Sequence, residues 1–408
     1  VCLIKLRDDK HVFIYDMHHI ISDAVSMQVL MRELTYIYNR KKLPVLKIQY
    51  KDYSSWQNTL ILSGAIKKQE AFWLELLKGE IPVLNMPLDY PRPLIQSFEG
   101  DYIVHTLGKG QKESLETLAK EHGATLFMLI LAAFNTLLYK YTGQEDIVVG
   151  SPIAGRSHED LQNVIGLFVN MLPMRNYPCG EKKFNEFLIE VKESCLSTYE
   201  NQDYQFEDMI EKLSIRRDMS RNPIFDVIVT FQSMNKEVLE LEGLKLVPFT
   251  QDLWVAKFDL SISALETEAG LFFGIEYCTK LFKRETVDRL TKHLINILLQ
   301  VAENPEVLLK DIDMLTEKER HSILYEFNNT RKEYPKDKTI HELFDEQAEK
   351  YPDKKAVIYN DSSLTYREIN LQANSLARVL RSKGVGPDQI VGVIIDKSLK
   401  MLIAILGI

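Results

Sequence analysis

The sequence predicts an α/β fold in the form of an α+β two-layer sandwich, in which helices cover a sheet. Two observations predict it. Runs rich in β-branched and aromatic residues, typical of strands, are mixed with longer segments whose apolar residues recur at helical spacing. In addition, the 408 residues are 45% hydrophobic and 26% charged, which is the composition of a globular protein with roughly two to four domains.

The first part of the chain predicts a strand, two helices and a proline-rich crossover. Residues 12–15 alternate Val and Ile with Phe and Tyr, which is typical of a strand. Apolar residues at helical spacing predict helices over 24–38 and 50–77. Four prolines fall within residues 82–93, so residues 79–97 cannot continue a helix or a central strand and are expected to form an extended crossover.

A second and longer segment mixes strands and helices. Its predicted strands cover residues 102–106, 146–150, 224–231 and 271–277. Its predicted helices cover residues 115–123, 125–141, 184–199 and 284–301. Gly143 follows the second of these helices and is expected to serve as its C-terminal cap.

A third pattern begins after a polar segment. Residues 304–332 are charged and broken by a proline, which predicts a linker with a short helix. Beyond it, the pattern predicts helices over 340–350 and 367–383, strands over 356–359 and 364–366, a buried strand over 390–395 and a further helix from Ser398. Because both ends of the chain look like cuts through folded elements, we expect it to be part of a longer polypeptide.

Charge and cysteine content exclude several classes of function. The chain has 50 Lys and Arg against 58 Asp and Glu, a formal charge of −8, which argues against nucleic acid or an anionic membrane as partner. The longest internal apolar run, residues 126–134, is far shorter than the ~20 residues of a membrane-spanning helix. Four dispersed cysteines form no metal-binding pair, so we expect reduced thiols, a cytoplasmic protein and no bound metal.

Two adjacent histidines after the first predicted strand form the sharpest chemical feature. His18 and His19 lie in a short turn before Asp23 and the helix over 24–38. Imidazole is the natural proton-transfer group near neutral pH, and a turn at a strand end presents side chains to a cleft. The residues alone leave two interpretations open: a buried, hydrogen-bonded histidine pair, or a catalytic histidine whose neighbour turns toward the protein body.

Six segments, in the same order along the chain, resemble the motifs of a known family. His18-His19-xxx-Asp23 resembles the HHxxxDG signature of condensation domains in nonribosomal peptide synthetases. Four further segments resemble later motifs of that domain: residues 50–56 (YKDYSSW), 165–170 (IGLFVN), 201–207 (NQDYQFE) and 217–225 (RDMSRNPIF). Residues 364–369 (LTYREI) resemble the first core motif of an adenylation domain, which follows a condensation domain in the usual module order.

The resemblance implies two lobes, each similar to chloramphenicol acetyltransferase, that meet at a tunnel with the histidine motif in the middle. Residues 1–85 would be the tail of an incomplete N-terminal lobe, residues 86–300 the C-terminal lobe, residues 301–335 a linker, and residues 336–408 the truncated start of an adenylation domain. Since one tunnel wall would then be incomplete, we expect this chain on its own to be inactive.

The implied reaction is amide formation by an acyltransferase. An aminoacyl or peptidyl thioester on an upstream carrier domain is attacked by the amine of an aminoacyl thioester on a downstream carrier domain. His19 matches the functional histidine, and its role as a general base or as a positioning group stays open. His18 would support the turn, and Asp23 would form an ion pair with an arginine earlier in the domain, outside this chain.

The remaining motif residues are assigned to the tunnel wall or the scaffold. The predicted tunnel residues are Ala24, Ser26 and Asn170. Ala24 replaces the family's glycine, and it either narrows the acceptor side of the tunnel or occupies the first helical turn, where alanine is well tolerated. The predicted structural ion pairs involve Arg217, Asp218 and Arg221.

The resemblance implies partners rather than a cofactor bound by this chain. The substrates would arrive on the phosphopantetheine arms of the carrier domains, and only a complete adenylation domain, whose remainder is a further partner, would need ATP and Mg²⁺. Three alternatives are an epimerisation domain of the same fold, a non-catalytic domain that docks carriers, and a free-standing acyltransferase that uses coenzyme A thioesters. Met27 stands where epimerisation domains carry Trp.

Overall fold

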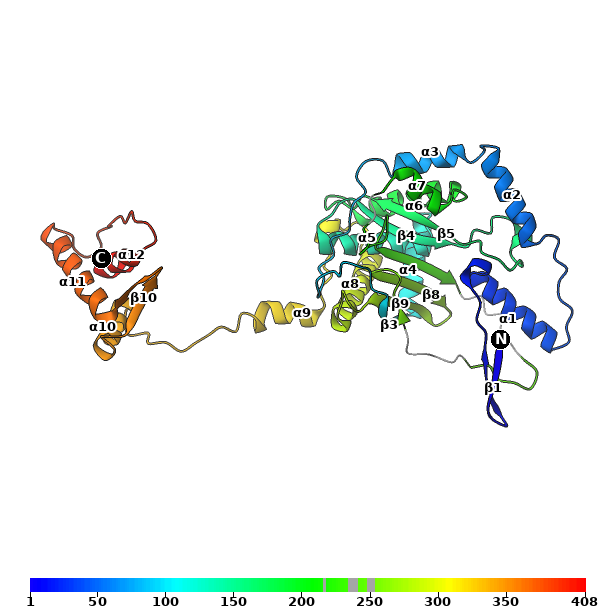
Figure 1. The fold of residues 1–408 in the computed structure, drawn as a ribbon. Helices are drawn as coiled ribbons and strands as arrows, with labels where there is room; N and C mark the ends of the chain where they lie inside the picture. The colour runs from blue at the N-terminus through cyan, green and yellow to red at the C-terminus, as the bar shows by residue number, and fades with distance from the viewer. Residues whose placement is uncertain (216–217, 234–240, 248–253) are drawn as a thin grey trace. The chain divides into compact units, whose positions relative to one another are not determined.

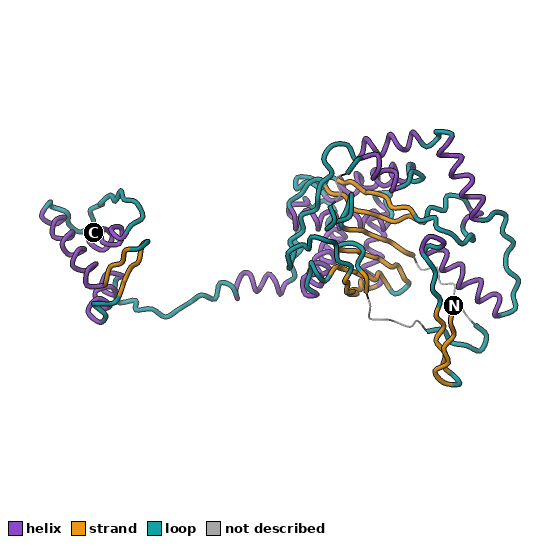
Figure 2. Tube along the Cα trace, viewed as in Figure 1, coloured by secondary structure: helices purple, strands orange, loops and turns teal. Residues whose placement is uncertain are grey.

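The structure, a computed structural model, describes residues 1–215, 218–233, 241–247 and 254–408. It divides into two compact units, Val1–Ser322 and Ile323–Ile408. Figure 1 shows the elements of each unit, and Figure 2 shows where helices, strands and loops follow one another.

The first unit begins with a hairpin of β1 (Cys2–Arg7) and β2 (Lys10–Ile14), followed by α1 (Ala24–Tyr38). The predicted helix over 50–77 is wrong in one respect, because the structure forms two helices there, α2 (Tyr50–Leu62) and α3 (Lys67–Leu76). Gly64 lies between them with φ of +74°, a left-handed conformation that interrupts a right-handed helix and that glycine adopts without strain.

One seven-stranded sheet forms the centre of the first unit, with strand order β5-β4-β6-β8-β9-β3-β7. β4, β6 and β8 are parallel to one another, and the other neighbours are antiparallel. The strands are β3 (Glu99–Gly108), β4 (Ile147–Ile153), β5 (Asn170–Asn176), β6 (Val227–Ser233), β7 (Trp254–Val255), β8 (Leu260–Thr267) and β9 (Gly270–Cys278). Residues 79–97, the predicted crossover, contain neither helix nor strand.

A layer of helices packs on this sheet, which confirms the predicted two-layer α/β fold class (Figure 1). The helices are α4 (Lys109–Glu121), α5 (Leu126–Thr142), α6 (Phe184–Glu200), α7 (Phe206–Leu213) and α8 (Arg284–Glu303). α5 packs on β4 and β6 and is flanked by α4, α6 and α8, so its apolar run 129–134 is fully buried. Gly143 caps α5 in the left-handed conformation, as predicted.

No single helix in the described ranges is long and apolar enough to cross a membrane; α4 and α5 meet that requirement only together, as a pair bent by 98°.

The end of the first unit extends beyond residue 301, where we expected a linker to start. Leu309 and Ile312 are buried in the main core, and α9 (Glu317–His321) follows. Apolar side chains therefore hold residues 305–322 on the unit, and the connecting segment starts at Ile323.

The second unit contains α10 (Ile340–Lys350), β10 (Lys355–Tyr359), β11 (Ser362–Thr365), α11 (Tyr366–Ser382) and α12 (Leu399–Gly407). Its small core gathers around Ile369, Ala373 and Ile403. The predicted buried strand over 390–395 is wrong: those residues form no strand, and Ile390 and Ile394 are fully exposed. A buried strand needs hydrogen-bonded neighbours, and the sheet in this unit pairs only β10 with β11.

Candidate active site

The histidine motif forms a tight turn between β2 and α1. A short 3₁₀ turn, His19–Ile21, follows His18, whose Nδ1 accepts a hydrogen bond from the backbone N–H of Ile20 at 3.1 Å. The backbone N–H of Ser22 closes the turn on the carbonyl of His19 at 3.1 Å. His18 therefore supports the turn from an exposed position, whereas we expected it to do so from the protein interior.

The His19 imidazole is exposed, and it makes no hydrogen bond within the described part of the chain. Its ring nitrogens are consequently available to an external proton donor or acceptor. Both histidine side chains are exposed in residues 1–408, so the structure gives no support to the interpretation of a buried histidine pair.

Asp23 connects the histidine turn to a distant part of the chain. It caps α1 by accepting a hydrogen bond from the N–H of Ser26 at 2.7 Å, and its other oxygen accepts one from the N–H of Phe168 at 3.0 Å. Arg156 completes the site with an ion pair at 3.0 Å, and both side chains are almost fully buried. The expected arginine partner earlier in the domain is thus corrected to Arg156, which lies 133 residues later.

Charge and hydrogen bonding keep Asp23 ionised. Burial alone would raise the pKa of its carboxyl, but hydrogen bonds from Ser26, Phe168 and Arg156 outweigh burial and lower the pKa below 3.8. The carboxylate therefore carries its charge at neutral pH and neutralises the buried guanidinium.

Arg156 organises the connection between β4 and β5, residues 154–169, which we call the β4–β5 connection. Its Nη1 donates to the carbonyls of Leu161 and Val164, each at 2.6 Å, and its guanidinium carbon lies 4.1 Å from the centroid of the Phe168 ring. Gly155 precedes it with φ of +62°, and a Cβ there would lie only 1.9 Å from the carbonyl oxygen of Phe168. Glycine is therefore required for this close approach.

Two predicted tunnel residues lie in this neighbourhood with different exposure. Ala24 is exposed and is the first residue of α1, so it lies in the first helical turn. Ser26 is fully buried, and its hydroxyl donates to the carbonyl of Gly166 at 2.7 Å. As lining residues of a passage, Ala24 and Ser26 remain predictions.

The third predicted tunnel residue, Asn170, joins two of the sequence motifs. It begins β5, and its amide nitrogen donates to the carbonyls of Gln202 and Tyr204, each at 2.9 Å. Its amide oxygen accepts from the N–H of Phe206 at 3.2 Å. The side chain thus holds the 201–207 segment against β5; its contact with a passage also remains a prediction.

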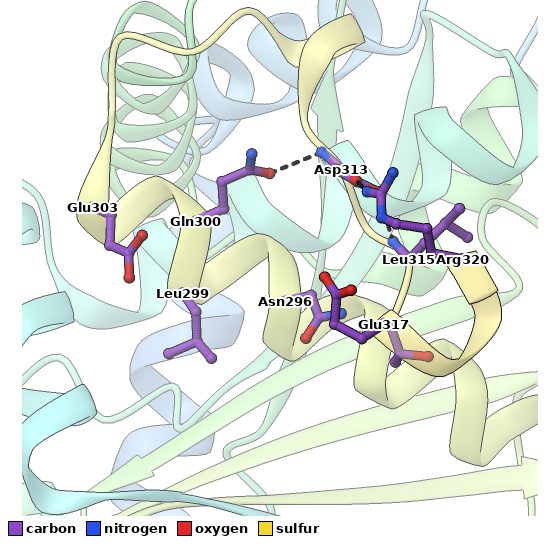
Figure 3. A pocket seen from close by; sticks show the side chains of 9 residues that line it. Asn296, Leu299, Gln300, Glu303, Asp313, Leu315, Glu317 and Arg320 are labelled. Atoms are coloured by element: carbon purple, nitrogen blue, oxygen red, sulfur yellow. Dashed lines mark hydrogen bonds and ion pairs between the residues drawn. The ribbon is translucent and has the colours of Figure 1, made fainter.

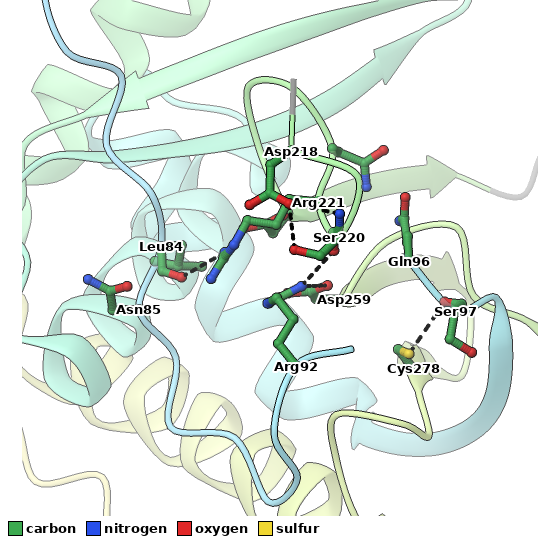
Figure 4. A network of polar contacts seen from close by, with 12 residues as sticks. Leu84, Asn85, Arg92, Gln96, Ser97, Asp218, Ser220, Arg221, Asp259 and Cys278 are labelled. Atoms are coloured by element: carbon green, nitrogen blue, oxygen red, sulfur yellow. Dashed lines mark hydrogen bonds and ion pairs between the residues drawn. The ribbon is translucent and has the colours of Figure 1, made fainter. Parts of the chain in front are cut away.

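The arginine-rich motif forms a separate polar network, shown in Figure 4. Arg221 forms an ion pair with buried Asp226, whereas Asp218 accepts hydrogen bonds from the N–H and hydroxyl of Ser220 at 2.8 and 2.7 Å. Asp218 therefore caps this loop, and its part in an ion pair stays a prediction. Arg217 lies outside the described residues.

A second ion pair in Figure 4 was not predicted from the sequence. Arg92, in the proline-rich crossover, binds the two carboxylate oxygens of Asp259 through Nη1 and Nη2, and its Nη1 also donates to the carbonyl of Ser220 at 3.2 Å. Burial and the neighbouring Asp259 raise the pKa of Asp226, with Arg221 and Arg92 opposing that shift. The network therefore fastens the crossover to the 218–226 loop.

A cavity of about 360 Å³ lies elsewhere, between α8 and residues 313–320 (Figure 3). Asn296, Gln300 and Glu303 line it from α8, and the Gln300 amide oxygen accepts from the N–H of Asp313 at 2.8 Å. The predicted site residues do not line this cavity. Among the residues that the structure describes, no group of three or more His, Cys, Asp or Glu side chains could hold a metal ion.

Sequence reasoning missed Arg156, Arg92, Asp226 and Asp259. The only local signal for Arg156 is its position after a glycine at the end of an apolar strand. Its pairing with Asp23 spans 133 residues and is visible only once β4 and α1 are placed.

Comparison with protein families gives two matches. The condensation-domain model matches residues 1–324, and the AMP-binding enzyme model matches residues 344–408. Gramicidin S synthase 2 of Brevibacillus brevis is 50% identical over 409 residues, and bacitracin synthase 3 of Bacillus licheniformis is 49% identical over 406 residues. Both alignments cover 100% of this chain, which spans 9% and 6% of the lengths of these relatives.

Two solved structures share the fold. A four-domain nonribosomal peptide synthetase bound to AMP and glycine superimposes with a TM-score of 0.78 at 24% identity, covering 96% of this chain and 31% of that chain. The X-domain from teicoplanin biosynthesis, solved in complex with OxyB, superimposes with a TM-score of 0.66 at 28% identity, covering 74% of this chain and 69% of that chain.

Proposed function

The chain belongs to the condensation-domain family and continues into the start of an AMP-binding enzyme domain, and from this premise we propose that it forms peptide bonds between carrier-tethered thioesters. The donor is an aminoacyl or peptidyl thioester on an upstream carrier domain, and the acceptor is an aminoacyl thioester on a downstream one. The relatives, named as synthases of gramicidin S and bacitracin, support a role in peptide antibiotic biosynthesis.

The proposed reaction transfers an acyl group from sulfur to nitrogen. The acceptor amine attacks the thioester carbonyl, a C–N bond forms, and the C–S bond breaks. The amine loses one proton, and the departing thiolate of the upstream phosphopantetheine arm gains one, so the products are an amide on the downstream carrier and a free thiol upstream. No cofactor is consumed, and both phosphopantetheine arms act as parts of the substrates.

One observation carries this proposal: the exposed His19 imidazole, held in a turn that is fixed on both sides. His18 caps the turn before it, and Asp23 anchors the helix after it. An imidazole with available nitrogens can accept the amine proton or hold the amine by a hydrogen bond, and both roles require that the turn does not move.

We propose the domain limits that the motifs imply. Residues 1–85 are the tail of the N-terminal lobe, residues 86–300 the C-terminal lobe, and residues 336–408 the start of the adenylation domain. Partners are the two carrier domains and the remainder of the adenylation domain, with ATP and Mg²⁺ needed only there. We propose a cytoplasmic location, and we expect residues 1–408 alone to be inactive.

The decisive experiment uses the complete synthetase that contains this chain, with both carriers loaded. We expect His19→Ala to lower the rate of dipeptide formation by about 10²–10⁴-fold, the usual contribution of a positioned acid–base group. His11→Ala is the matched control, because His11 is also exposed but lies within β2 rather than in the turn. An unchanged rate for His19→Ala would overturn the proposed function.

The stereochemistry of the product separates condensation from epimerisation. We propose an L-donor and an L-acceptor, since Ile20-Ile21-Ser22 and Val25-Ser26-Met27 resemble that class. Chiral chromatography of the released dipeptide is expected to show retained L configuration. Accumulation of a D-residue without amide formation would identify an epimerisation domain instead, and preference for a D-donor would remove the L-class assignment.

A non-catalytic docking domain is the second candidate function. The observation that favours it is the likeness to the teicoplanin X-domain, which was solved in complex with another protein, OxyB. In that case carriers would bind the chain, but dipeptide formation would not depend on it. The His19→Ala measurement therefore distinguishes the two candidates directly.

A further inference from the structure

A buried hydroxyl on the first turn of α1, that of Ser26, joins this turn to the β4–β5 connection in addition to the contacts of Asp23. Ser26 is 0% exposed, and its Oγ donates a hydrogen bond to the carbonyl of Gly166 at 2.7 Å. The same oxygen accepts hydrogen bonds from the N–H of Gly166 and from Nη2 of Arg156, each at 3.0 Å. One donor and two acceptor sites are all that a serine hydroxyl has, so Ser26 is fully used.

Gly166 is held from its other side by α2. A Cβ on Gly166 would lie 2.0 Å from a ring carbon of Tyr50, so the backbone packs directly against that ring. The Tyr50 hydroxyl donates to the carbonyl of the next residue, Leu167, at 2.9 Å. The peptide groups of residues 166–167 therefore lie between α1 and α2, with a side-chain hydrogen bond from each helix.

The connection between Ser26 and His19 is short and follows the backbone. The 3₁₀ turn His19–Ile21 leads through Ser22 to Asp23, the N-terminal cap, and Ser26 is the third residue of α1. Asp23 fixes the start of the helix axis, through Phe168 and Arg156. Ser26 adds a second anchor one turn later, and two anchors determine the direction of a helix end as well as its location.

We propose that Ser26 is a positioning residue: through Gly166, its hydroxyl fixes the first turn of α1 and thereby the placement of the His19 imidazole against the reacting amine. This inference rests on the proposed condensation function. It assigns to Ser26 a role that acts through His19, in place of the contact with the substrate tunnel that the sequence suggested.

The physical basis is that catalysis by proximity loses rate when a reacting group is displaced by even a small distance. Removing the hydroxyl leaves the N–H and carbonyl of Gly166 and one guanidinium hydrogen of Arg156 without their buried partner. The first turn of α1 then shifts to recover hydrogen bonds. A displacement of about 1 Å at a reacting group can cost about 10²-fold in rate.

The test measures single-turnover dipeptide formation by the complete synthetase with loaded carriers. Four proteins form a cycle: the unsubstituted protein, Ser26→Ala, His19→Ala and the double variant. We expect Ser26→Ala to lower the rate by about 10- to 100-fold when His19 is present. We expect it to leave the residual rate of His19→Ala unchanged, because a positioning residue has no effect once the group it positions is absent.

Two further variants keep the outcome decisive. Thr35→Val is the matched control, because Thr35 is buried in the same helix and its hydroxyl donates within the helix, to the carbonyl of Met31 at 2.8 Å. This variant is expected to retain the full rate. Ser26→Cys keeps the shape of the side chain, with a somewhat larger sulfur atom, and weakens the hydrogen bonds. It replaces Ser26→Ala in the cycle if thermal unfolding shows that the alanine variant does not fold.

The outcomes separate this inference from the proposed function. An equal fall in rate from the Ser26 variant with and without His19, or no fall at all, would overturn the positioning role while the His19→Ala result still stands. An unchanged rate for His19→Ala would overturn the proposed function itself, and the positioning role with it.

Discussion

At the scale of single residues, Asp23 combines three tasks in one carboxylate. It caps α1, it holds the backbone of Phe168, and it neutralises buried Arg156. Of the three, the ion pair contributes most to the free energy of unfolding, because a buried guanidinium without its partner strongly destabilises the fold. Exposed ion pairs contribute little.

We therefore expect Asp23→Asn to lower the free energy of unfolding of the first unit by about 3–5 kcal/mol, the usual cost of leaving one member of a buried pair uncompensated. Asparagine keeps a helix-capping oxygen, so the loss reports on charge rather than on capping. Urea unfolding followed by tryptophan fluorescence measures it. Asp8→Asn is the control, since Asp8 pairs with Lys5 in an exposed hairpin, and a change below about 1 kcal/mol is expected there.

Acidification provides an independent measure of the same interaction. The pKa of Asp23 lies below its usual 3.8 in the folded chain, so its carboxylate stabilises the fold above about pH 4. That stability is lost as the pH falls through the lower folded pKa. The free energy of unfolding of the unsubstituted chain should fall more steeply below pH 4 than that of Asp23→Asn, and parallel pH curves would contradict this account.

At the scale of elements, a contact between buried His293 and half-buried Glu319 holds the end of the first unit in place. His293 on α8 lies 2.9 Å from Glu319 on α9 through Nε2 and 2.8 Å from the Tyr141 hydroxyl through Nδ1. Burial would raise the pKa of Glu319, but hydrogen bonds from Thr316 and His293 lower it to about 2. The carboxylate is thus ionised at neutral pH and holds α9 on α8.

We expect Glu319→Ala to release residues 313–321 from α8 while the sheet stays folded, because one charged acceptor serves both the cap of α9 and the contact with His293. Hydrogen–deuterium exchange with mass spectrometry should show faster exchange in that segment. Glu317→Ala, in the exposed first turn of the same helix, is expected to leave the exchange unchanged. Equal exchange in both variants would disprove the fastening role of Glu319.

Some of the helices, strands and contacts could be predicted from the sequence and others could not. α5 and α8 were predictable because their apolar residues repeat at helical spacing over many turns. β8 was missed although Leu260, Ile262 and Ala264 alternate with polar residues, and β5 was missed because Pro173 and Asn170 interrupt the strand pattern. The histidine turn was predictable since it is local, whereas the partners of Asp23 and Asn170 depend on tertiary placement.

At the scale of the whole molecule, two units are connected by an exposed segment. Residues 323–342 are all exposed, and residues 329–339 form neither helix nor strand. The segment contains Arg331, Lys332 and Lys336, each of which is a trypsin site.

We expect limited trypsin digestion to cut within 331–336 before it cuts the helices and strands of either unit, because proteases need an extended, accessible backbone. Mass spectrometry should detect two complementary fragments that separate near residue 335. Lys192, in the middle of α6, serves as the internal control. Earlier cleavage at Lys192 would contradict the division into two units.

The β4–β5 connection has one more consequence. It leaves the sheet at Ile153 and returns at Asn170, and these two residues are paired directly across the two strands. Both ends of this connection are therefore held in neighbouring strands of the sheet, so it cannot rotate about one end. The histidine turn, which contacts the connection through Asp23, moves with the β4–β5 edge. Movement of the β4–β5 edge should therefore displace the His19 imidazole with it. Under the proposed function, the stiffness of that edge determines how closely the reacting groups are aligned.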